Sequence, residues 1–355
     1  MPIAIQNTAA QRLASHAQEL LDGGLCGVGI QASLATDYET YDVALGYSRL
    51  DELAMDRHTL YPIYCAGKPL LALAVMLAAE DAGLEVHESL KPYGYPSCCI
   101  SELLSHSAGV VGPSLGQYRF TPRTKRPETA RNITLGGPVA YSEVGAWILL
   151  ERLLETLTGW SADEYIRANV LQPLGLTGHF FLTPEEALTT SVWERIGLYY
   201  GHLPERPMPM ASELWAGLDV VSPATGVLGT MHGLGTLVHA VSQVVRGRLQ
   251  TPALPSAAYL LSAMRSSRGS VMDPVLGSLL DFAGGFMLNR GSGPFGGLVS
   301  NSAFGHLGWL GTAFVVHDPA TCRTLAALTN AVTIEGDFAR IVRLGLIGAA
   351  FGSAG

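Results

Sequence analysis

A cysteine and a lysine three residues apart are the side chains of this sequence best placed for nucleophilic chemistry. Cys65 and Lys68 come just before an apolar run from Leu70 to Ala79, which predicts a helix closed by Gly83. Residues i and i+3 share one helix face, so the amine can approach the sulfur, and the positive end of the helix dipole lies near both. Both effects favour a thiolate, which is a nucleophile. The competing interpretation is a buried, unreactive cysteine beside a lysine that extends to the surface.

Several segments, in order along the chain, resemble the serine β-lactamase and penicillin-binding-protein family, in particular its class C β-lactamase and esterase branch. The match extends over most of the sequence. Its main motifs are Tyr64-Cys65-Ala66-Gly67-Lys68 in place of S-x-x-K, Leu103-Leu104-Ser105-His106-Ser107-Ala108-Gly109 for LLxHxSG, Tyr141-Ser142-Glu143-Val144-Gly145 for Y-S-N-x-G, and Gly305-His306-Leu307-Gly308-Trp309 for the K-T-G or H-T-G strand.

Three departures from the family pattern bear on the substrate. Cys65 occupies the place of the nucleophilic serine, while Lys68 is retained, which favours a changed nucleophile over a decayed site. Glu143 replaces an asparagine that helps to hold a substrate amide, and a carboxylate there would repel an anion or attract an amine. Leu307 replaces a threonine whose hydroxyl commonly meets a substrate carboxylate. Both changes argue against a β-lactam or D-alanyl peptide substrate.

The resemblance also implies a role for each site residue. Cys65 would attack a carbonyl to form a thioester, and Lys68 would stabilise the thiolate or relay its proton. Tyr141 would protonate the leaving group and then deprotonate the acceptor. The backbone N–H groups of Cys65 and Trp309 would form the oxyanion hole. His306 would tune Tyr141 electrostatically, although a hydrogen-bonded strand histidine is the alternative. Three residues would contact the substrate: Glu143, Leu307 and Gly308. His106 is expected to be structural.

These roles predict an acyltransferase that works through a thioester acyl-enzyme, because a thioester is relatively reactive toward amines and thiols. Its donor and acceptor would be small molecules, and the product an amide or ester of secondary metabolism. No cofactor or metal is expected, since the histidines lack ligand spacing. An esterase or amidase is the second hypothesis, and a non-catalytic binding protein that kept the fold is the third. The sequence alone does not distinguish a native Cys65 from an engineered replacement of serine.

The order of predicted elements gives the architecture that must position these residues. Helices are expected at 8–22, 142–157, 231–245 and 338–350, and strands at 28–34, 40–47, 284–288, 303–306, 312–317 and 324–329. This order predicts an α+β fold, with an antiparallel sheet flanked by helices and an inserted, mostly α-helical region. The sheet region would comprise residues 1–85 and 225–355, the insertion residues 86–224, and the active site would lie between them.

Composition narrows the remaining possibilities. The 355 residues contain 22 Lys+Arg and 30 Asp+Glu, a net charge of −8, without the basic run that a nucleic-acid binder needs. No apolar stretch reaches the roughly 18 residues of a membrane span. The first residues lack the basic and apolar segments of a secretory signal, so a cytoplasmic protein is expected, in which cysteines stay reduced. The oligomeric state is left open.

Overall fold

Both ends of the chain contribute strands to one nine-stranded antiparallel sheet. The computed structural model describes residues 8–50, 52–113, 133–183, 186, 188–201, 208–209, 226–291, 293–332 and 336–352. The sheet order is β11-β12-β13-β14-β15-β16-β1-β2-β3. The strands are β1 (Gly29–Ala35), β2 (Thr40–Arg49), β3 (Leu53–Ala54), β11 (Val271–Asp273), β12 (Ser278–Ala283), β13 (Phe286–Leu288), β14 (Phe304–Leu307), β15 (Ala313–Asp318) and β16 (Arg323–Thr329).

The internal strand β1 is buried along its whole length because helices cover both faces of the sheet. Its side chains alternate between two cores, as the period of two in a strand requires. Ile30, Ala32 and Leu34 belong to the core beneath the terminal helices. Gln31 and Ser33 face the opposite side, where Gln31 accepts the backbone N–H of Met231 at 2.6 Å.

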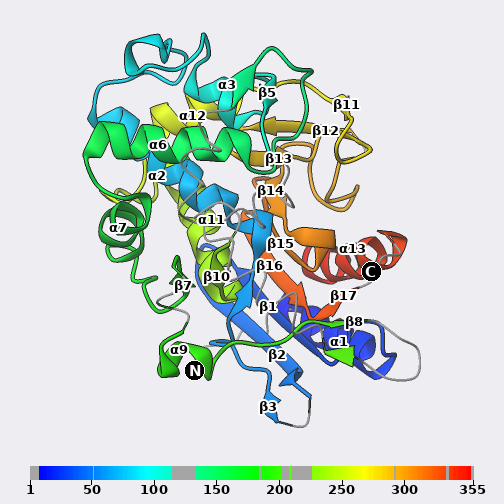
Figure 1. The fold of residues 1–355 in the computed structure, drawn as a ribbon. Coiled ribbons are helices and arrows are strands. Elements are labelled where there is room, and N and C mark those ends of the chain that lie inside the picture. Colours follow the sequence, from blue (N-terminus) through cyan, green and yellow to red (C-terminus); the bar gives the residue numbers. More distant parts are fainter. Residues whose placement is uncertain are drawn as a thin grey trace.

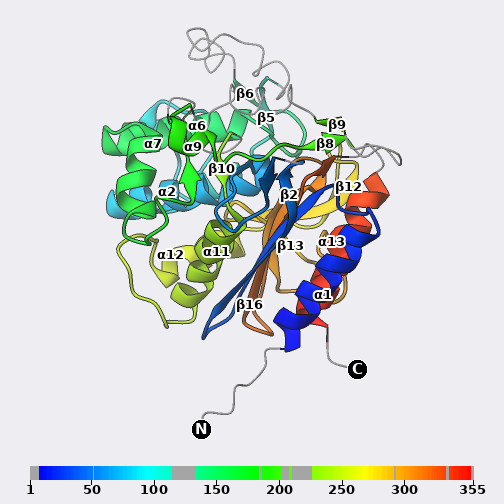
Figure 2. The ribbon, with the colours of Figure 1, turned by 90° about the horizontal axis from the view of Figure 1, so that it is seen from below.

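The first and last helices of the chain lie side by side on one face of this sheet (Figure 2). They are α1 (Thr8–Asp22) and α13 (Gly336–Phe351). The other face carries α11 (Met231–Val245), with α12 (Ala257–Arg265) beside it. Beyond α11 and α12 lies a helical region, in the upper left of Figure 1.

Helix α2 (Lys68–Asp81) is the centre of that helical region. It is buried from Lys68 to Ala79, which agrees with a helix that is apolar on all sides, and it packs against α6 (Gly145–Thr158). The remaining helical elements are α3 (Ile100–Leu104), α7 (Ala162–Tyr165), α9 (Thr190–Trp193), the π-helix η4 (Ile166–Leu171), and the 3-10 turns η1 (Tyr64–Gly67), η2 (Lys91–Tyr93) and η5 (Trp309–Gly311).

Three small sheets accompany the nine-stranded sheet. One has the order β4-β10-β7, a second β17-β8-β9, and the third pairs β5 with β6. Their strands are β4 (Tyr61–Pro62), β5 (Val110–Val111), β6 (Thr134–Leu135), β7 (Phe180–Phe181), β8 (Tyr200–Gly201), β9 (Met208–Pro209), β10 (Leu228–Gly229) and β17 (Ala331–Val332).

The predicted α+β fold class is confirmed, and the predicted long helices agree with α1, α6, α11 and α13 to within a few residues. The strand predicted at 284–288 begins later, at Phe286, because Gly284 and Gly285 have positive φ and form the turn after β12. Helix α12 and the β11–β12 hairpin were not predicted. Of the predicted insertion 86–224, residues 114–132 and most of 202–224 lie outside the described part, and the division into regions stays a prediction. No helix in the described ranges is long and apolar enough to cross a membrane.

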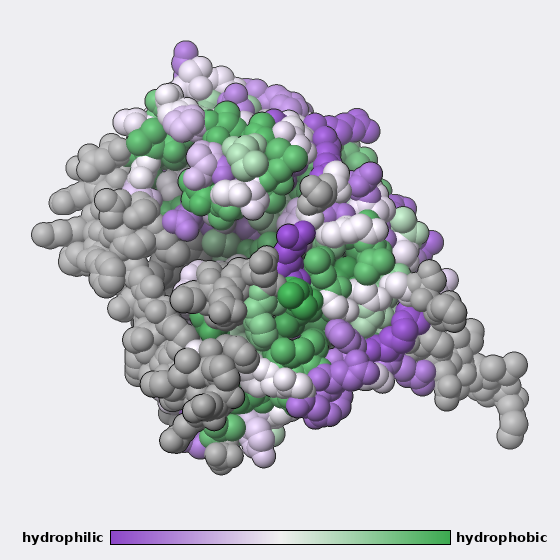
Figure 3. All heavy atoms as spheres, turned by 90° about the vertical axis from the view of Figure 1, so that its right-hand side faces the viewer, coloured by the Kyte–Doolittle hydropathy of each residue, from purple (hydrophilic) through white to green (hydrophobic). Residues whose placement is uncertain are grey.

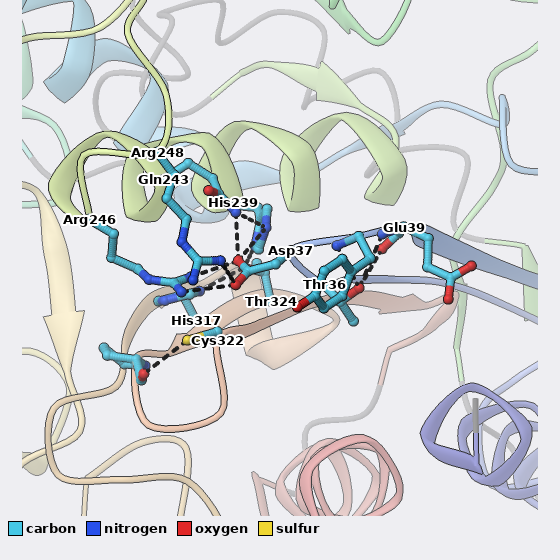
Figure 4. A network of polar contacts seen from close by, with 12 residues as sticks. Thr36, Asp37, Glu39, His239, Gln243, Arg246, Arg248, His317, Cys322 and Thr324 are labelled. Carbon is cyan, nitrogen blue, oxygen red and sulfur yellow. Dashed lines mark hydrogen bonds and ion pairs between the residues drawn. The ribbon is translucent and has the colours of Figure 1, made fainter. Parts of the chain in front are cut away.

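A polar network fastens the β1–β2 turn to the end of α11 (Figure 4). The carboxylate of Asp37 accepts two hydrogen bonds from Arg246, at 2.6 and 2.9 Å, and one from Gln243 at 2.7 Å. Arg248 also pairs with it. The hydrogen bond from Arg246 is the main cause that lowers the pKa of Asp37 to about 2.

Replacing Asp37 by asparagine should therefore destabilise the fold. We expect the free energy of unfolding at pH 7 to fall by about 1–2 kcal/mol. This is the value of a charged hydrogen bond, reduced because the site is partly open to solvent. Because the pKa of Asp37 is lower in the folded state than in the unfolded chain, the ionised carboxylate stabilises the fold at pH values above about 4, its pKa in the unfolded chain. This contribution is lost as the pH falls toward 2. Urea unfolding at several pH values checks this, with the exposed Glu39→Gln of the same turn as control. If the difference in free energy of unfolding between wild type and Asp37→Asn stays constant down to pH 2, the stabilising role of the ionised Asp37 is contradicted.

Candidate active site

The backbone just before Cys65 is strained in a way that fixes where its side chain lies. Tyr64 has a φ of +48°, a left-handed conformation that costs a non-glycine residue about 1–2 kcal/mol. Cys65 follows on the 3-10 turn η1, directly before α2. Its side chain is half-buried and lines a cavity of about 940 Å³. The turn therefore presents a free thiol to a space large enough for a small-molecule substrate.

Lys68, the first residue of α2, is fully buried beside Cys65. Its Nζ donates to the backbone carbonyl of Glu143 at 2.8 Å and lies 5.0 Å from the ring centre of Trp147. Burial lowers the pKa of the Lys68 amine, while the charge of Cys65 and a hydrogen bond with it act in the opposite direction. A buried amine that holds its proton less firmly than usual can accept one from the thiol.

Tyr141 is also buried, and it lies next to the thiol. Burial raises the pKa of its phenol well above the usual value, and the negative charge and hydrogen bond of Cys65 raise it further. The phenol therefore stays protonated at neutral pH and can donate its proton. Lys68 Nζ lies 5.7 Å from the centre of the Tyr141 ring. The structure thus brings together three residues that the sequence motifs pointed to, from segments more than 70 residues apart.

An acidic residue that sequence reasoning missed holds the Tyr141 backbone in place. Asp273, at the end of β11, accepts the backbone N–H of Tyr141 at 2.7 Å. The same carboxylate pairs with Arg268 at 2.8 Å, and the two side chains are only 0% and 1% exposed. Its other oxygen accepts the N–H groups of Val275 and Leu276 in the hairpin turn. The Asp-Pro dipeptide at 273–274 is a turn signal that could have located the hairpin.

His306 lies on β14 with a neutral ring. Its Nδ1 donates to the Leu307 carbonyl at 2.9 Å, and the side chain is buried. Burial, assisted by the charge of Lys68, lowers the pKa of His306 to about 3. The ring centre is 6.4 Å from that of Tyr141. Any influence of His306 on Tyr141 at neutral pH therefore comes from a neutral ring, and the electrostatic tuning of Tyr141 stays a prediction.

The end of β14 approaches the nucleophile segment closely, which explains the glycine there. A Cβ on Gly308 would lie 2.8 Å from the carbonyl oxygen of Ile63, two residues before Cys65. Trp309 then begins the 3-10 turn η5, as Cys65 lies in the first turn of η1. The first N–H groups of a helical turn have no acceptor within it. Both N–H groups expected to form the oxyanion hole therefore lie at the start of short helical turns.

His106 lies closer to the centre than its expected structural role suggested. It has a positive φ of 56°, and its Nδ1 accepts the backbone N–H of Ser142 at 3.1 Å. Its ring centre is 4.7 Å from that of Tyr141. Burial lowers the pKa of His106 well below its usual value, so the ring is neutral. His106 positions the Tyr141 segment and is separated from the cavity by it.

The cavity is lined by exposed apolar side chains and by charged residues of both signs. Met272, Leu276 and Leu279 of the β11–β12 hairpin line it and are strongly exposed. Figure 3 shows hydrophobic side chains over much of the face that carries this hairpin and α13. Glu143 contributes a carboxylate, and α13 contributes Arg340 and Arg343. Leu307 and Gly308, expected to contact the substrate, also line the cavity. Within the described ranges, no three His, Cys, Asp or Glu side chains are grouped as a metal site requires.

Comparison with solved structures shows how widely this fold is shared. The hydrolase EstCE1, described as having promiscuous acyltransferase activity, matches with a TM-score of 0.77 at 20% identity, covering 97% of this chain and 99% of that one. The D-amino acid amidase of Ochrobactrum anthropi SV3, complexed with L-phenylalanine amide, matches with a TM-score of 0.75 at 16% identity, covering 96% and 97%. At such identities the likeness shows the fold alone.

Comparison by sequence gives the family. The chain is 24% identical over 254 residues to a protein of Escherichia coli (strain K12) with the provisional name D-alanyl-D-alanine carboxypeptidase. That match covers 65% of this chain but 56% of the relative, so the chain spans little more than half of that protein. Residues 18–349 match the family model described as Beta-lactamase. Because this model spans nearly the whole sequence, the chain belongs to the β-lactamase family.

Proposed function

We propose that the protein is an acyltransferase that forms a thioester acyl-enzyme on Cys65. The observation that carries this proposal is the position of the Cys65 thiol, hydrogen-bonded to a lysine whose pKa is lowered and to a tyrosine whose pKa is raised. The two neighbours suit opposite tasks, because the amine can take a proton and the phenol can give one.

The proposed reaction has two steps. In the first, the Cys65 sulfur attacks the donor carbonyl, Lys68 takes the thiol proton, and the N–H groups of Cys65 and Trp309 bind the developing oxyanion. Tyr141 gives its proton to the leaving group, and a proton from Lys68 restores the phenol. In the second, the acceptor attacks the thioester, its proton passes to the Tyr141–Lys68 pair, and the thiol is released in its original form.

Transfer to an acceptor is favoured over hydrolysis by the chemistry of the thioester and by the apolar side chains that line the cavity. A thioester reacts readily with amines and thiols, and an apolar lining limits the access of water. The acceptor would be a small amine or alcohol and the product an amide or ester. All five cysteines are free, which suits the reducing cytoplasm that we propose as the compartment.

A chase experiment separates transfer from hydrolysis. The enzyme is acylated with an activated thioester, freed of excess donor, and then mixed with buffer alone or with buffer and an amine. We expect the Cys65 adduct, followed by intact-protein mass spectrometry, to disappear at least roughly tenfold faster with the amine, with the amide as product, since the preformed site positions the acceptor. Equal rates with and without amines or alcohols, with only free acid released, would establish the hydrolase instead.

Glu143 offers a test of acceptor recognition. Its side chain lines the cavity, whereas its contact with Lys68 uses the backbone carbonyl and survives a side-chain change. If the carboxylate receives an amine, Glu143→Asn should lower kcat/KM for the amine roughly tenfold, the value of one charged hydrogen bond. The acylation rate should fall less. A variant with unchanged acceptor kinetics would exclude this role of Glu143.

A further inference from the structure

Helix α13 carries a buried cation for which the described part of the chain supplies no counter-ion. Arg343 is 9% exposed, and its Nε has no hydrogen-bond partner. Within the described part of the chain, no carboxylate forms an ion pair with it. Arg268, another buried guanidinium, is paired with Asp273 at 2.8 Å. Arg343 is therefore unusual for a buried charge, since such groups are normally paired.

The charge of Arg343 persists despite its burial. Burial, with a smaller effect of the neighbouring Arg340, lowers the pKa of Arg343 to about 10. The guanidinium is thus still protonated at neutral pH. A desolvated cation beside a second cation is unfavourable until an anion reaches it, and the planar guanidinium fork fits a carboxylate or a phosphate with two hydrogen bonds.

The position of Arg343 connects this cation to the reaction centre. Arg343 and Cys65 line the same cavity. The guanidinium lies against Gly311, where an added Cβ would be 2.7 Å from Arg343 Nη1. Gly311 closes the turn η5, which begins at Trp309 of the oxyanion hole. Glu143 lines this cavity as well, and its carboxylate would repel an anion that lies close to it.

We propose that Arg343 binds an anionic oxygen group, a carboxylate or a phosphate, on the acyl donor of this enzyme. The inference rests on the proposed function, because it assigns a substrate class to the same site. The apolar side chains of Met272, Leu276 and Leu279 would hold the aliphatic part of the donor. The anionic group belongs either to the far end of the acyl chain or to the leaving group.

Two matched pairs of thioesters test the proposal and separate these sources. Glutaryl N-acetylcysteamine is compared with its monomethyl ester, and acetyl 4′-phosphopantetheine with acetyl pantetheine. Intact-protein mass spectrometry gives the acylation rate of Cys65 for each. We expect the anionic member of one pair to acylate roughly 10- to 100-fold faster than its neutral partner, the range of a charged hydrogen bond. That ratio should approach one in Arg343→Met and be partly retained in Arg343→Lys.

The matched control is Arg152→Met, which removes an exposed arginine of α6 and should keep the wild-type ratio. If Cys65 is acylated without a preference for the anionic member of either pair, the anion site is refuted, while the proposed acyltransferase function still stands. If none of the four thioesters acylates Cys65, the proposed function fails. Calorimetry with glutarate and with 4′-phosphopantetheine then still decides the anion site. Binding to wild type that is lost in Arg343→Met supports it, and no binding, or equal binding to both proteins, refutes it.

Discussion

Replacing Cys65 by alanine should abolish acylation of the protein by activated thioesters while leaving the fold unchanged. The half-buried thiol sits on a turn whose conformation is set by Tyr64, so that the loss of one sulfur atom disturbs little packing. Without the nucleophile, only the binding groups and the oxyanion N–H groups remain. We expect turnover to fall by at least about 10³-fold, as in other enzymes that lose a covalent nucleophile. Intact-protein mass spectrometry and a urea unfolding curve together check both statements.

A second substitution tests whether the nucleophile must be a thiol or whether a hydroxyl is sufficient. Cys65→Ser supplies the residue that the family normally carries at this position. We expect it to form an oxygen ester more slowly, and to pass the acyl group to amines less readily, because an oxygen ester is less reactive toward them than a thioester. Transfer at the wild-type rate would show that the thioester is not needed.

Cys99 is the natural control for labelling, because it is also half-buried but lies in a different part of the helical region. Burial raises the pKa of its thiol, which lowers its reactivity. Labelling should persist in Cys99→Ala and vanish in Cys65→Ala. The opposite pattern would show that the adduct forms outside the proposed site.

The residues that we propose as reactive could be picked out from the sequence because each lies in a short local motif. Cys65 and Lys68 are one helical turn apart, and Tyr141 begins a second motif. The periodic apolar patterns also gave the helices, since amphipathic or wholly apolar helices have a recognisable repeat. These features depend only on residues that are neighbours in the sequence, so they can be recognised without knowledge of the fold.

The residues that support and complete the site could not be predicted, because tertiary pairing alone brings them there. Asp273 contacts the Tyr141 backbone across 132 positions of sequence. Asp273 ends β11, a three-residue strand at the edge of the sheet. Such a strand is too short to show a clear alternation of apolar and polar residues. Arg343 occurs in an ordinary apolar helix, and only the folded structure shows that it lines the cavity. The neutral state of His306 likewise follows from burial, which the motif does not encode.

Lys68→Met should reduce the acylation rate roughly 10²- to 10⁴-fold, the usual contribution of a general base. Methionine nearly matches the length of the lysine stem, and replacing a buried charge by an apolar group is often neutral for stability. The wild-type rate should rise with pH as the Lys68 amine loses its proton, and level off below the usual lysine range because burial lowers this pKa. In Lys68→Met this pH dependence should be lost. A variant with the wild-type profile would exclude Lys68 as the base.

Lys68→Arg then decides whether the lysine relays a proton or only stabilises a thiolate by its charge. Arginine keeps a positive charge near Cys65 but does not give up its proton in a protein. If charge is sufficient, acylation in Lys68→Arg should exceed that of Lys68→Met by at least about tenfold. We expect instead that both variants are similarly slow, because the lowered pKa of the Lys68 amine suits proton transfer and weakens its role as a permanent cation. Acylation rates of the two variants, measured at matched folded fractions, distinguish the two outcomes.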